Sequence, residues 1–295
     1  MLLLDGKKTA QQIKEEIQEA VRLRKAKGLR IPHLAAVLVG NDGASLTYVG
    51  SKVRSCERIG IHSTLIQLEE NITQEALLAQ IESLNANPDI DGYIVQLPLP
   101  KHIDEQRVLL AVAPEKDVDG FHPLNFGRMA LELEAFIPAT PFGIIELLKR
   151  YQIPTSGKHC VVIGRSHIVG RPISILMSQK GPAGNATVTL AHSRTENLKA
   201  LTLQADIIVS ALGIPEFLKA DMVKDGVIVI DVGITRVPDA AATKGYVIKG
   251  DVAYEEVAAK AQAITPVPGG VGPMTIAMLL ENTLLACQRK DALAN

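Results

Sequence analysis

Short apolar runs of strand length alternate with stretches of helical pattern along almost the whole chain. Seven runs are expected to be strands: "HLAAVLVG" (33–40), "STLIQL" (63–68), "GYIVQL" (92–97), "HCVVIG" (159–164), "ATVTLA" (186–191), "DIIVSALG" (206–213) and "GVIVID" (226–231). Helical patterns lie between them at 7–27, 45–59, 73–84 and 170–180. This alternation is typical of mostly parallel sheets covered by helices. We therefore expect an α/β protein.

Proline and glycine residues indicate where the chain divides. Within "IPATPFGIIELLKRYQIPTSGKH" a helix is expected over 142–151, because prolines bracket it and a glycine precedes the next strand. A length of 295 residues is typical of about two domains. We predict an N-terminal domain over 1–140, a dinucleotide-binding domain over 141–273, and a C-terminal helix within 274–295 that packs back on the first domain. The cleft between the two domains is the expected ligand site.

Charge and composition exclude several classes of partner. Lys and Arg number 31 against 32 Asp and Glu, so the net charge of -1 gives no attraction to nucleic acid or anionic membranes. Aromatic residues are only 3% and tryptophan is absent, which argues against stacking on single-stranded nucleic acid. No apolar run is long enough for a membrane span, and the N-terminus lacks the pattern of a signal peptide. Cys56, Cys160 and Cys287 form no Cys-x-x-Cys and are expected to be buried thiols of a cytoplasmic protein.

The segment "KHCVVIGRSHIVGRP" has the pattern strand, glycine turn, helix. Gly164 ends the strand, Ser166 stands where a second glycine is common, and Gly170 begins the helix. The spacing is one residue longer than G-x-G-x-x-G, so the motif alone is only moderately specific. Its position within a βαβ unit favours a dinucleotide site, where backbone N–H groups and a helix N-terminus face phosphate. The alternative is a tight turn without a ligand.

The end of the next strand indicates which dinucleotide would bind. NAD-binding domains usually carry Asp or Glu there for the ribose 2′-hydroxyl, but "LAHSRTENL" has no acid before Glu196. Ser193 could donate a hydrogen bond to a 2′-phosphate, and Arg194 or Arg165 could pair with it. The sequence therefore favours NADP over NAD. The alternative for either arginine is a solvated surface charge.

A lysine lies on the apolar face of an expected helix. Ser45 is expected to cap this helix, which runs to about Ile59. At 100° per residue, Lys52 falls on one arc with Leu46, Tyr48, Val49, Val53, Cys56 and Ile59, whereas the other arc holds Thr47, Ser51, Arg54, Ser55, Glu57 and Arg58. A lysine placed there must extend to water, form a pair or lose its proton, and a neutral amine can act as a base. The alternative is a lysine stem that merely covers apolar surface.

Two further polar residues could join Lys52. Gln96 follows an expected strand at its carboxyl end, the edge of a parallel sheet where ligands gather. Asp119, in "APEKDVDGFHP", could accept two N–H groups from a 2-amino-4-oxo heterocycle. The alternatives are a loop-capping amide for Gln96 and ordinary turn chemistry for Asp119.

The Tyr-x-x-x-Lys spacing of Tyr48 and Lys52 also occurs in short-chain dehydrogenases. In that family the glycine turn comes first and the Tyr/Lys pair far downstream, whereas here Gly164 follows the pair by a whole domain. A shikimate-dehydrogenase-like enzyme, with its own substrate domain and lysine, remains an alternative. A non-enzymatic NADP-binding regulator is another.

Six segments occur in a fixed order from end to end: "YVGSKVRSCERIGI", "GYIVQLPLP", "PEKDVDGFHP", "VVIGRSHIVGRP", "IVIDVGI" and "ITPVPGGVGPMT". Together they resemble the bifunctional methylenetetrahydrofolate dehydrogenase/methenyltetrahydrofolate cyclohydrolase family. Neither alternative above would explain the segments "EKDVDG" and "TPVPGGVGPMT". The resemblance implies a homodimer whose two α/β domains flank a cleft, the C-terminal one of Rossmann type. It also implies NADP-dependent oxidation of 5,10-methylenetetrahydrofolate and hydrolysis of the product to 10-formyltetrahydrofolate, in one-carbon metabolism and purine biosynthesis.

The resemblance also assigns roles to residues. Lys52 would be the catalytic lysine, Tyr48 and Gln96 would position it, and Asp119 would hold the pterin. NADP would be held by Gly164, Arg165, Ser166, Ser193, Arg194 and Ile234. The folate substrate would be bound by Tyr48, Lys52, Gln96, Asp119, Pro268, Gly269 and Gly272. No metal is implied, because no histidine has ligand spacing to another ligand residue. How Arg165 and Arg194 share the 2′-phosphate, and whether Lys52 acts directly or through a water, stay open, and 181–185 and 238–245 resemble small insertions.

Overall fold

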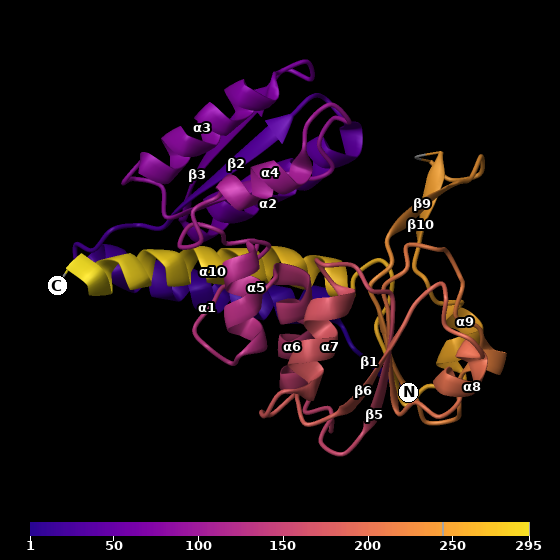
Figure 1. Ribbon diagram of the computed structural model, residues 1–295. Coiled ribbons are helices and arrows are strands. Elements are labelled where there is room, and N and C mark those ends of the chain that lie inside the picture. Colours follow the sequence, from indigo (N-terminus) through magenta and orange to yellow (C-terminus); the bar gives the residue numbers. More distant parts are fainter. Residues whose placement is uncertain (244, 295) are drawn as a thin grey trace. The chain divides into compact units, whose positions relative to one another are not determined.

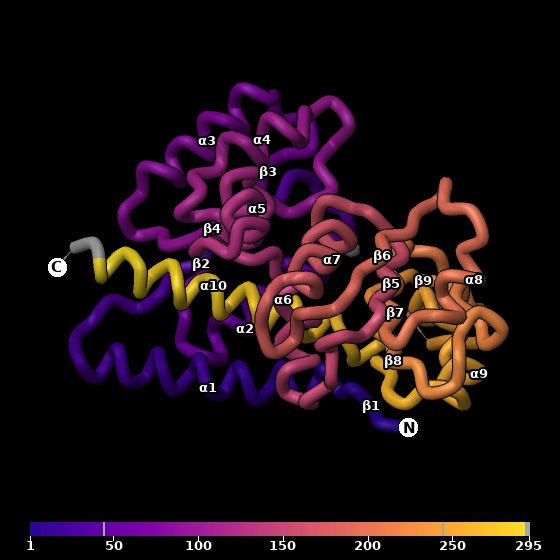
Figure 2. Tube along the Cα trace, turned by 60° about the horizontal axis from the view of Figure 1, so that its bottom comes forward, coloured from indigo at the N-terminus to yellow at the C-terminus, as the bar shows by residue number. Residues whose placement is uncertain are grey.

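The computed structural model describes residues 1–243 and 245–294, which group into two compact units. Unit 1 comprises Met1–Gln11 and Thr140–Thr275; unit 2 comprises Gln12–Ala139 and the chain from Ile276 onward. Two long helices, α1 (Gly6–Ala26) and α10 (Val271–Ala294), each contribute residues to both units (Figures 1 and 2).

Unit 1 contains a six-stranded parallel sheet. Its strand order is β1-β11-β8-β7-β5-β6, with β1 (Leu2–Leu3), β5 (His159–Ile163), β6 (Thr187–Ala191), β7 (Ile207–Ser210), β8 (Ile228–Asp231) and β11 (Ala263–Ile264). Its other elements are α6 (Ala139–Arg150), α7 (Gly170–Ser178), α8 (Leu198–Thr202), the 3-10 helix η1 (Ala220–Met222), α9 (Tyr254–Ala258) and the antiparallel hairpin of β9 (Thr235–Pro238) and β10 (Tyr246–Lys249).

The connection order of this sheet creates a switch point beside β5. From β5 the chain passes to β6 on one side and then to β7 on the other. Strands β7 and β8 are buried along their whole length, which explains why their sequences are continuous apolar runs without alternation. In open parallel sheets, ligands bind outside the carboxyl ends of the strands at such a switch point. The end of β5 is therefore the expected nucleotide position.

Unit 2 contains a three-stranded parallel sheet in the order β3-β2-β4: β3 (His62–Leu68), β2 (His33–Val39) and β4 (Gly92–Val95). Alternate residues of β2 (Ala35, Val37 and Val39) pack against α3 (Gln74–Ala86) and α4 (Glu105–Ala111). Helix α2 (Gly43–Ile59) contacts β2 and β3, which lie between α3 and α2 in Figure 1. A further helix, α5 (Pro123–Ala130), follows the loop after α4.

The C-terminal part of α10 belongs to the core of unit 2. Asn282 is buried, and its side-chain amide donates to the carbonyl oxygens of Val118 (2.8 Å) and Ile137 (3.0 Å). Because both acceptors lie in loops of unit 2, this helix fixes the segment that carries Asp119. The last helix is thus a structural part of the unit that carries Lys52.

The prediction of mainly parallel α/β architecture is confirmed, and the seven predicted strands correspond to β2 through β8. The predicted domain 1–140 differs from unit 2 at its start: residues 1–11 group with unit 1, because β1 pairs with β11 in parallel. Of the segment 238–245, Pro238 ends β9, and residues 239–243 and Gly245 precede β10; Lys244 lies outside the described residues. Across the described ranges, no helix is long and apolar enough to span a membrane.

Candidate functional site

Helix α2 begins earlier than the sequence suggested. Its N-cap is Asp42, whose carboxylate accepts the backbone N–H of Ser45 at 2.8 Å. The prediction that Ser45 caps the helix is wrong, because Ser45 is a buried residue of the first turn. Gly60, with φ 78°, ends the helix in the left-handed conformation that glycine adopts without strain.

The helix buries one continuous face, and Lys52 is part of it. Lys52 is 5% exposed, in line with buried Val49, Cys56 and Ile59. The predicted division into an apolar and a polar arc is wrong for two residues. Leu46 is 38% exposed, whereas Ser55 is buried because it packs toward α1 and lies 3.4 Å from the amine of Lys14.

The Lys52 amine lies among polar and aromatic partners. Its Nζ donates to Gln96 Oε1 at 3.3 Å and lies 4.6 Å from the centroid of the Tyr48 ring, one helical turn away. Burial lowers the pKa of Lys52, and the negative charge of Asp119 partly opposes this change. The amine is therefore more easily deprotonated than a lysine in water. The alternative in which the Lys52 amine extends into water is excluded by its burial.

Gln96 is oriented by its own loop. It follows β4 at the carboxyl end, and its backbone N–H donates to the Val37 carbonyl at 2.9 Å. Its side-chain Nε2 donates to the Leu97 carbonyl at 2.6 Å, so Oε1 is turned toward Lys52. A fixed acceptor beside the amine holds the lysine side chain in one position.

The two aspartates of "DVDG" have different surroundings. Asp117 is buried and accepts the backbone N–H groups of Phe121 (3.1 Å) and His122 (2.8 Å) and the side-chain amide of Asn125 (2.8 Å). Burial raises the pKa of Asp117 to about 6. Asp117 is thus the turn residue. Burial also raises the pKa of partly buried Asp119, and the charge of Lys52 lowers it, so Asp119 is electrostatically coupled to the lysine.

The glycine turn after β5 is closely packed. Gly164 has φ 119°, and a Cβ there would lie 2.2 Å from the carbonyl oxygen of Ala211, just past β7. A Cβ on Gly170, at the start of α7, would lie 2.0 Å from the Gly164 carbonyl. Ser166 Oγ accepts the N–H groups of Val169 (3.1 Å) and Gly170 (3.2 Å), so the residue that replaces a second glycine ties the turn to the helix. This compact turn lies at the switch point and presents the N-terminus of α7.

The end of β6 carries exposed groups that suit a phosphate. The His192 N–H donates to Thr195 Oγ1 at 2.8 Å, and His192 Nδ1 accepts the Arg194 N–H at 3.1 Å, which shapes the loop. Ser193 and Arg194 are exposed, as is Arg165 in the glycine turn. No carboxylate occupies positions 192–195. The residues present therefore fit a dinucleotide that carries a 2′-phosphate.

The remaining predicted residues lie in unit 1. Ile234 is 58% exposed, and its Cδ1 lies 3.0 Å from where a Cβ on Gly272 would stand, so these two are neighbours. Pro268 is exposed, and Gly269 has φ 109° and accepts the Lys7 N–H at 2.8 Å. Their contacts with nucleotide or folate stay predictions.

Sequence reasoning missed a pair of buried carboxylates near the glycine turn. Asp231 accepts the N–H groups of Gly233, Asp251 and Val252 at 2.9–3.0 Å, and burial raises its pKa to about 6. Asp251 in turn accepts two N–H groups in the loop after β7. The pair holds the loops at the carboxyl ends of β7 and β8. The sequence feature that could have indicated this site is an acidic residue, Asp231, at the end of the apolar strand in "VIVIDVG".

The cysteines are buried thiols without disulfides, as predicted. Burial raises the pKa of both Cys56 and Cys160 to about 12. Within residues 1–243 and 245–294, no three His, Cys, Asp or Glu side chains converge in a manner suited to a metal ion.

A glycine substitution tests the packing of the turn. Gly164→Ala is expected to weaken NADP⁺ binding about tenfold or more, because the new methyl group must displace the backbone at Ala211. Gly226→Ala is the matched control: Gly226 also has positive φ (77°), but nothing lies within 4 Å of its Cβ position. Calorimetric titration of both variants with NADP⁺ checks this, and equal weakening in the two would contradict it.

Known proteins match this chain over nearly its whole length. Residues 4–119 match the family model described as tetrahydrofolate dehydrogenase/cyclohydrolase, catalytic domain, and residues 138–291 match its NAD(P)-binding domain. A relative from Flavobacterium johnsoniae, named bifunctional protein FolD, is 70% identical over 292 residues, 99% of each chain. A relative of the same name from Bacteroides fragilis is 56% identical over 286 residues, 97% of this chain and 98% of that one.

Solved structures of the same family are also similar to this chain over nearly its whole length. The bifunctional methylenetetrahydrofolate dehydrogenase/cyclohydrolase from Campylobacter jejuni has a TM-score of 0.92 and 50% identity, covering 98% of this chain and 99% of that one. The Trypanosoma brucei enzyme, complexed with NADP cofactor and inhibitor, has a TM-score of 0.92 and 37% identity, covering 98% of each chain.

The glycine turn at the switch point, and the lysine-bearing second unit, define the class: a two-unit α/β enzyme with an NAD(P)-binding domain. Within that class, the chain belongs to the tetrahydrofolate dehydrogenase/cyclohydrolase family. The resemblance seen in the sequence is confirmed, and the shikimate-dehydrogenase and regulator alternatives are set aside.

Proposed function

We propose that the chain oxidises 5,10-methylenetetrahydrofolate with NADP⁺ and hydrolyses the resulting methenyl compound to 10-formyltetrahydrofolate, with Lys52 as the group that handles protons. Family membership and close full-length relatives support both activities and the cofactor. The observation that carries the role of Lys52 is its burial beside Gln96, because burial favours the neutral amine.

Lys52 serves the hydrolytic step as a base. Water adds to the methenyl carbon between N5 and N10, loses a proton, and gives a neutral adduct. The C–N5 bond then breaks as N5 gains a proton, the hydroxyl loses its own, and one proton is released in total. A neutral amine that gains and returns a proton lowers the barrier for both transfers. Gln96 and Tyr48 keep the Lys52 side chain in position for this work.

The oxidative step places a different demand on the lysine. Bound NADP⁺ supplies the hydride acceptor, and Gly164, Arg165, Ser166, Ser193, Arg194 and Ile234 are the residues proposed to hold it. Loss of hydride leaves a cationic one-carbon bridge on the folate. A protonated Lys52 near that bridge would oppose the cation, so the neutral form suits this step as well.

Asp119 is proposed to orient the substrate. Its carboxylate can accept two N–H groups from the 2-amino-4-oxo edge of the pterin, a charge-assisted pairing. Its electrostatic coupling to Lys52 supports a position close to the reacting groups. The proposed folate contacts of Pro268, Gly269 and Gly272 rest on the family resemblance.

Cofactor preference provides a direct test of the β6 end. The dehydrogenase is expected to prefer NADP⁺ over NAD⁺ by about a hundredfold or more in kcat/KM, because charge-assisted bonds to the 2′-phosphate contribute roughly 1.5–3 kcal/mol each. Arg194→Ser should lower this preference, whereas Lys219→Ser, which removes an exposed charge outside the β6 loop, should not. Equal turnover with both cofactors in the parent protein would contradict the assignment.

We also propose a cytoplasmic homodimer in one-carbon metabolism whose product serves purine biosynthesis. The family resemblance supports the dimer, and the balanced charge and buried thiols support the compartment. Light scattering after gel filtration tests the dimer: a monomer mass at micromolar concentration would contradict it.

Hydrolysis without nucleotide tests the function most simply. The purified chain is mixed with methenyltetrahydrofolate, and the loss of its absorbance is followed against a buffer blank. We expect catalysed loss without NADP⁺. No acceleration over the blank would refute the hydrolytic role.

A further inference from the structure

A pocket of about 900 Å³ lies in unit 2, at the opposite end of β4 from Lys52. Ile90 and Asp91, just before β4, line it, whereas Gln96, beside Lys52, follows the same strand. Its volume falls within the range of small-molecule sites. The proposed reaction uses none of its lining residues.

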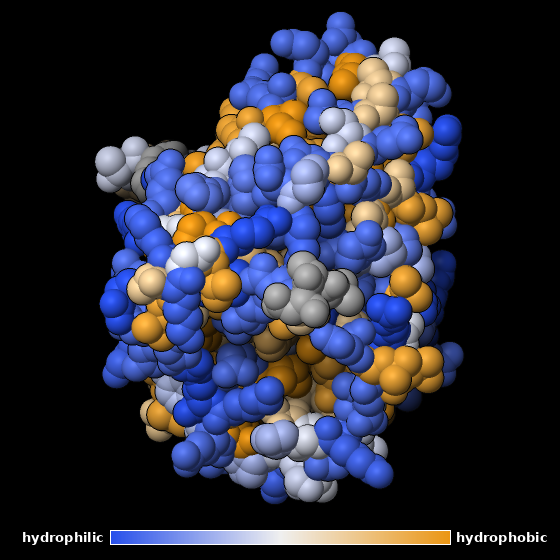
Figure 3. Space-filling view, turned by 90° about the vertical axis from the view of Figure 1, so that its left-hand side faces the viewer, coloured by the Kyte–Doolittle hydropathy of each residue, from blue (hydrophilic) through white to orange (hydrophobic). Residues whose placement is uncertain are grey.

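The pocket has an apolar body. Phe136, Ile90 and Ala286 are buried among its lining residues. Leu124 and Leu133 also line it but are 45% and 57% exposed. Large apolar side chains left uncovered around a concave site are typical of binding surfaces. Figure 3 shows hydrophobic groups between hydrophilic ones on the face where α10 ends.

Four cations line the same pocket: Lys116, Arg128, Arg289 and Lys290. Arg289 lies flat against the pocket wall, with its guanidinium 4.6 Å over the Phe136 ring and its Nε 2.7 Å from Glu134. Arg128 is exposed, and its side chain has no ion-pair partner among the residues that the structure describes. Arg128 is therefore available to a ligand.

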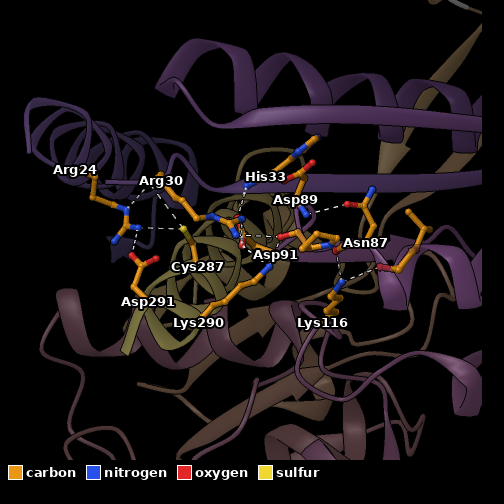
Figure 4. Close-up of polar contacts among 12 residues, drawn as sticks. Arg24, Arg30, His33, Asn87, Asp89, Asp91, Lys116, Cys287, Lys290 and Asp291 are labelled. Atoms are coloured by element: carbon orange, nitrogen blue, oxygen red, sulfur yellow. Dashed lines mark hydrogen bonds and ion pairs between the residues drawn. The ribbon is translucent and has the colours of Figure 1, made fainter. Parts of the chain in front are cut away.

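The carboxylates of the pocket are largely committed. Asp91 is buried and accepts Arg30 Nη2 at 2.7 Å and the His33 N–H at 2.9 Å, with Lys290 at 3.9 Å (Figure 4). Glu134 already pairs with Arg289. Exposed Glu115 is the remaining acid in the lining. The lining thus carries four cations against three carboxylates, a net excess of one positive charge.

Repulsion among the cations points the same way. Lys116 Nζ donates to the carbonyls of Leu84 and Asn87, close to Asp91 and Lys290 in Figure 4. Burial lowers the pKa of Lys116 and the charge of Lys290 lowers it further, whereas the charges of Glu115 and Asp91 act in the opposite direction. A bound anion would relieve this repulsion.

We propose that this pocket is a second small-molecule site, which binds a compact amphipathic anion with its apolar body against Leu124 and Leu133 and its charged group near Arg128 and Lys290. An aromatic or short acyl carboxylate, sulfonate or phosphate has this chemistry. The site is independent of the folate reaction, because it lies at the other end of the β4 strand.

The probe 8-anilinonaphthalene-1-sulfonate, an aromatic anion whose fluorescence rises on binding, tests the site. Titrations use the full chain with saturating NADP⁺, so that the nucleotide site is closed to the dye. We expect one equivalent to bind, and Arg128→Glu to weaken its Kd about tenfold or more. Arg107→Glu, which reverses another exposed arginine of unit 2, and Lys52→Met should leave the Kd unchanged.

Two further measurements separate charge from shape. N-phenyl-1-naphthylamine has the same rings without the sulfonate and should bind about tenfold more weakly or worse. Ala292→Trp places a large side chain on an exposed lining position and should also reduce dye binding. The proposal is overturned if Arg128→Glu and Ala292→Trp bind the sulfonate like the parent, or if the uncharged dye binds equally well. Should Arg128→Glu fail to fold, the Ala292→Trp variant and the comparison of the charged with the uncharged dye still test the proposal.

Discussion

Replacing Lys52 with methionine is expected to slow nucleotide-free hydrolysis of methenyltetrahydrofolate by about 10²–10⁴-fold, the range that a positioned acid–base group contributes. Methionine keeps the length and apolar stem of the side chain but can neither accept nor return a proton. The stem of Lys52 is buried between Val49 and Cys56 on α2, so the substitution should not disturb the packing. Rates of absorbance loss measured over a range of substrate concentrations give kcat and KM separately, and we expect the substitution to lower kcat.

Two controls accompany Lys52→Met. NADP⁺ affinity should stay within about twofold of the parent, because the glycine turn proposed to bind the nucleotide belongs to unit 1 and Lys52 to unit 2. Thermal unfolding should occur at the same or a higher temperature, since the variant removes an amine whose desolvation opposes folding. Lys27→Met, at an exposed lysine of the same unit, should leave every measurement unchanged. Full hydrolysis by Lys52→Met would remove the lysine from the mechanism.

Asp119→Asn is expected to lower kcat/KM of both activities by about 10–150-fold, the equivalent of 1.5–3 kcal/mol for a lost charge-assisted hydrogen bond. It should also shift the pH profile. In the proposed mechanism hydrolysis requires the neutral amine, so its rate should rise with pH through the pKa of Lys52. Asp119 raises that pKa, and removal of its charge lowers it. The rising limb should therefore move to lower pH.

The neighbouring acid provides the control for Asp119. Glu115→Gln removes an exposed charge from the same segment and should change neither KM nor the pH limb. If the rising limb of the pH profile moved to higher pH in Asp119→Asn, the proposed effect of the carboxylate on Lys52 would be wrong. If kcat/KM were unaltered, its proposed contact with the substrate would be wrong.

The fold was predictable from local pattern where the sequence contains a clear apolar run. The seven runs became β2 through β8. Five of these strands (β2, β4, β5, β7 and β8) are buried along nearly their whole length, as a continuous apolar sequence predicts, whereas the edge strands β3 and β6 are more exposed. Strands β1 and β11 were not predictable: two residues each carry no periodicity, and only their long-range pairing defines them. In the hairpin, β9 alternates between half-buried and exposed residues and β10 is half-buried throughout, so neither strand contains a run of buried residues.

The site was predictable where one element determines it. The spacing of Tyr48 and Lys52 places both on one turn of α2, and the strand end places Gln96 at the carboxyl edge of the sheet. The burial of Ser55 was not predictable, because α1 creates it from a distant part of the chain. The different roles of Asp117 and Asp119 depend on which backbone N–H groups each can reach, and the sequence does not contain that information. The contacts of Asp231 and Asp251 join separate loops in the same way.

The titration of one amine tests the central claim most directly. In protein labelled with ¹³C at lysine Cε, the Lys52 signal, assigned by its absence from Lys52→Met, is followed with pH without folate or nucleotide. A nitrogen buried between Tyr48 and Gln96 should lose its proton at a midpoint below the ordinary lysine value of 10.5. A midpoint at or above 10.5 would mean a solvated, charged ammonium, and the proposed chemistry would lose its base.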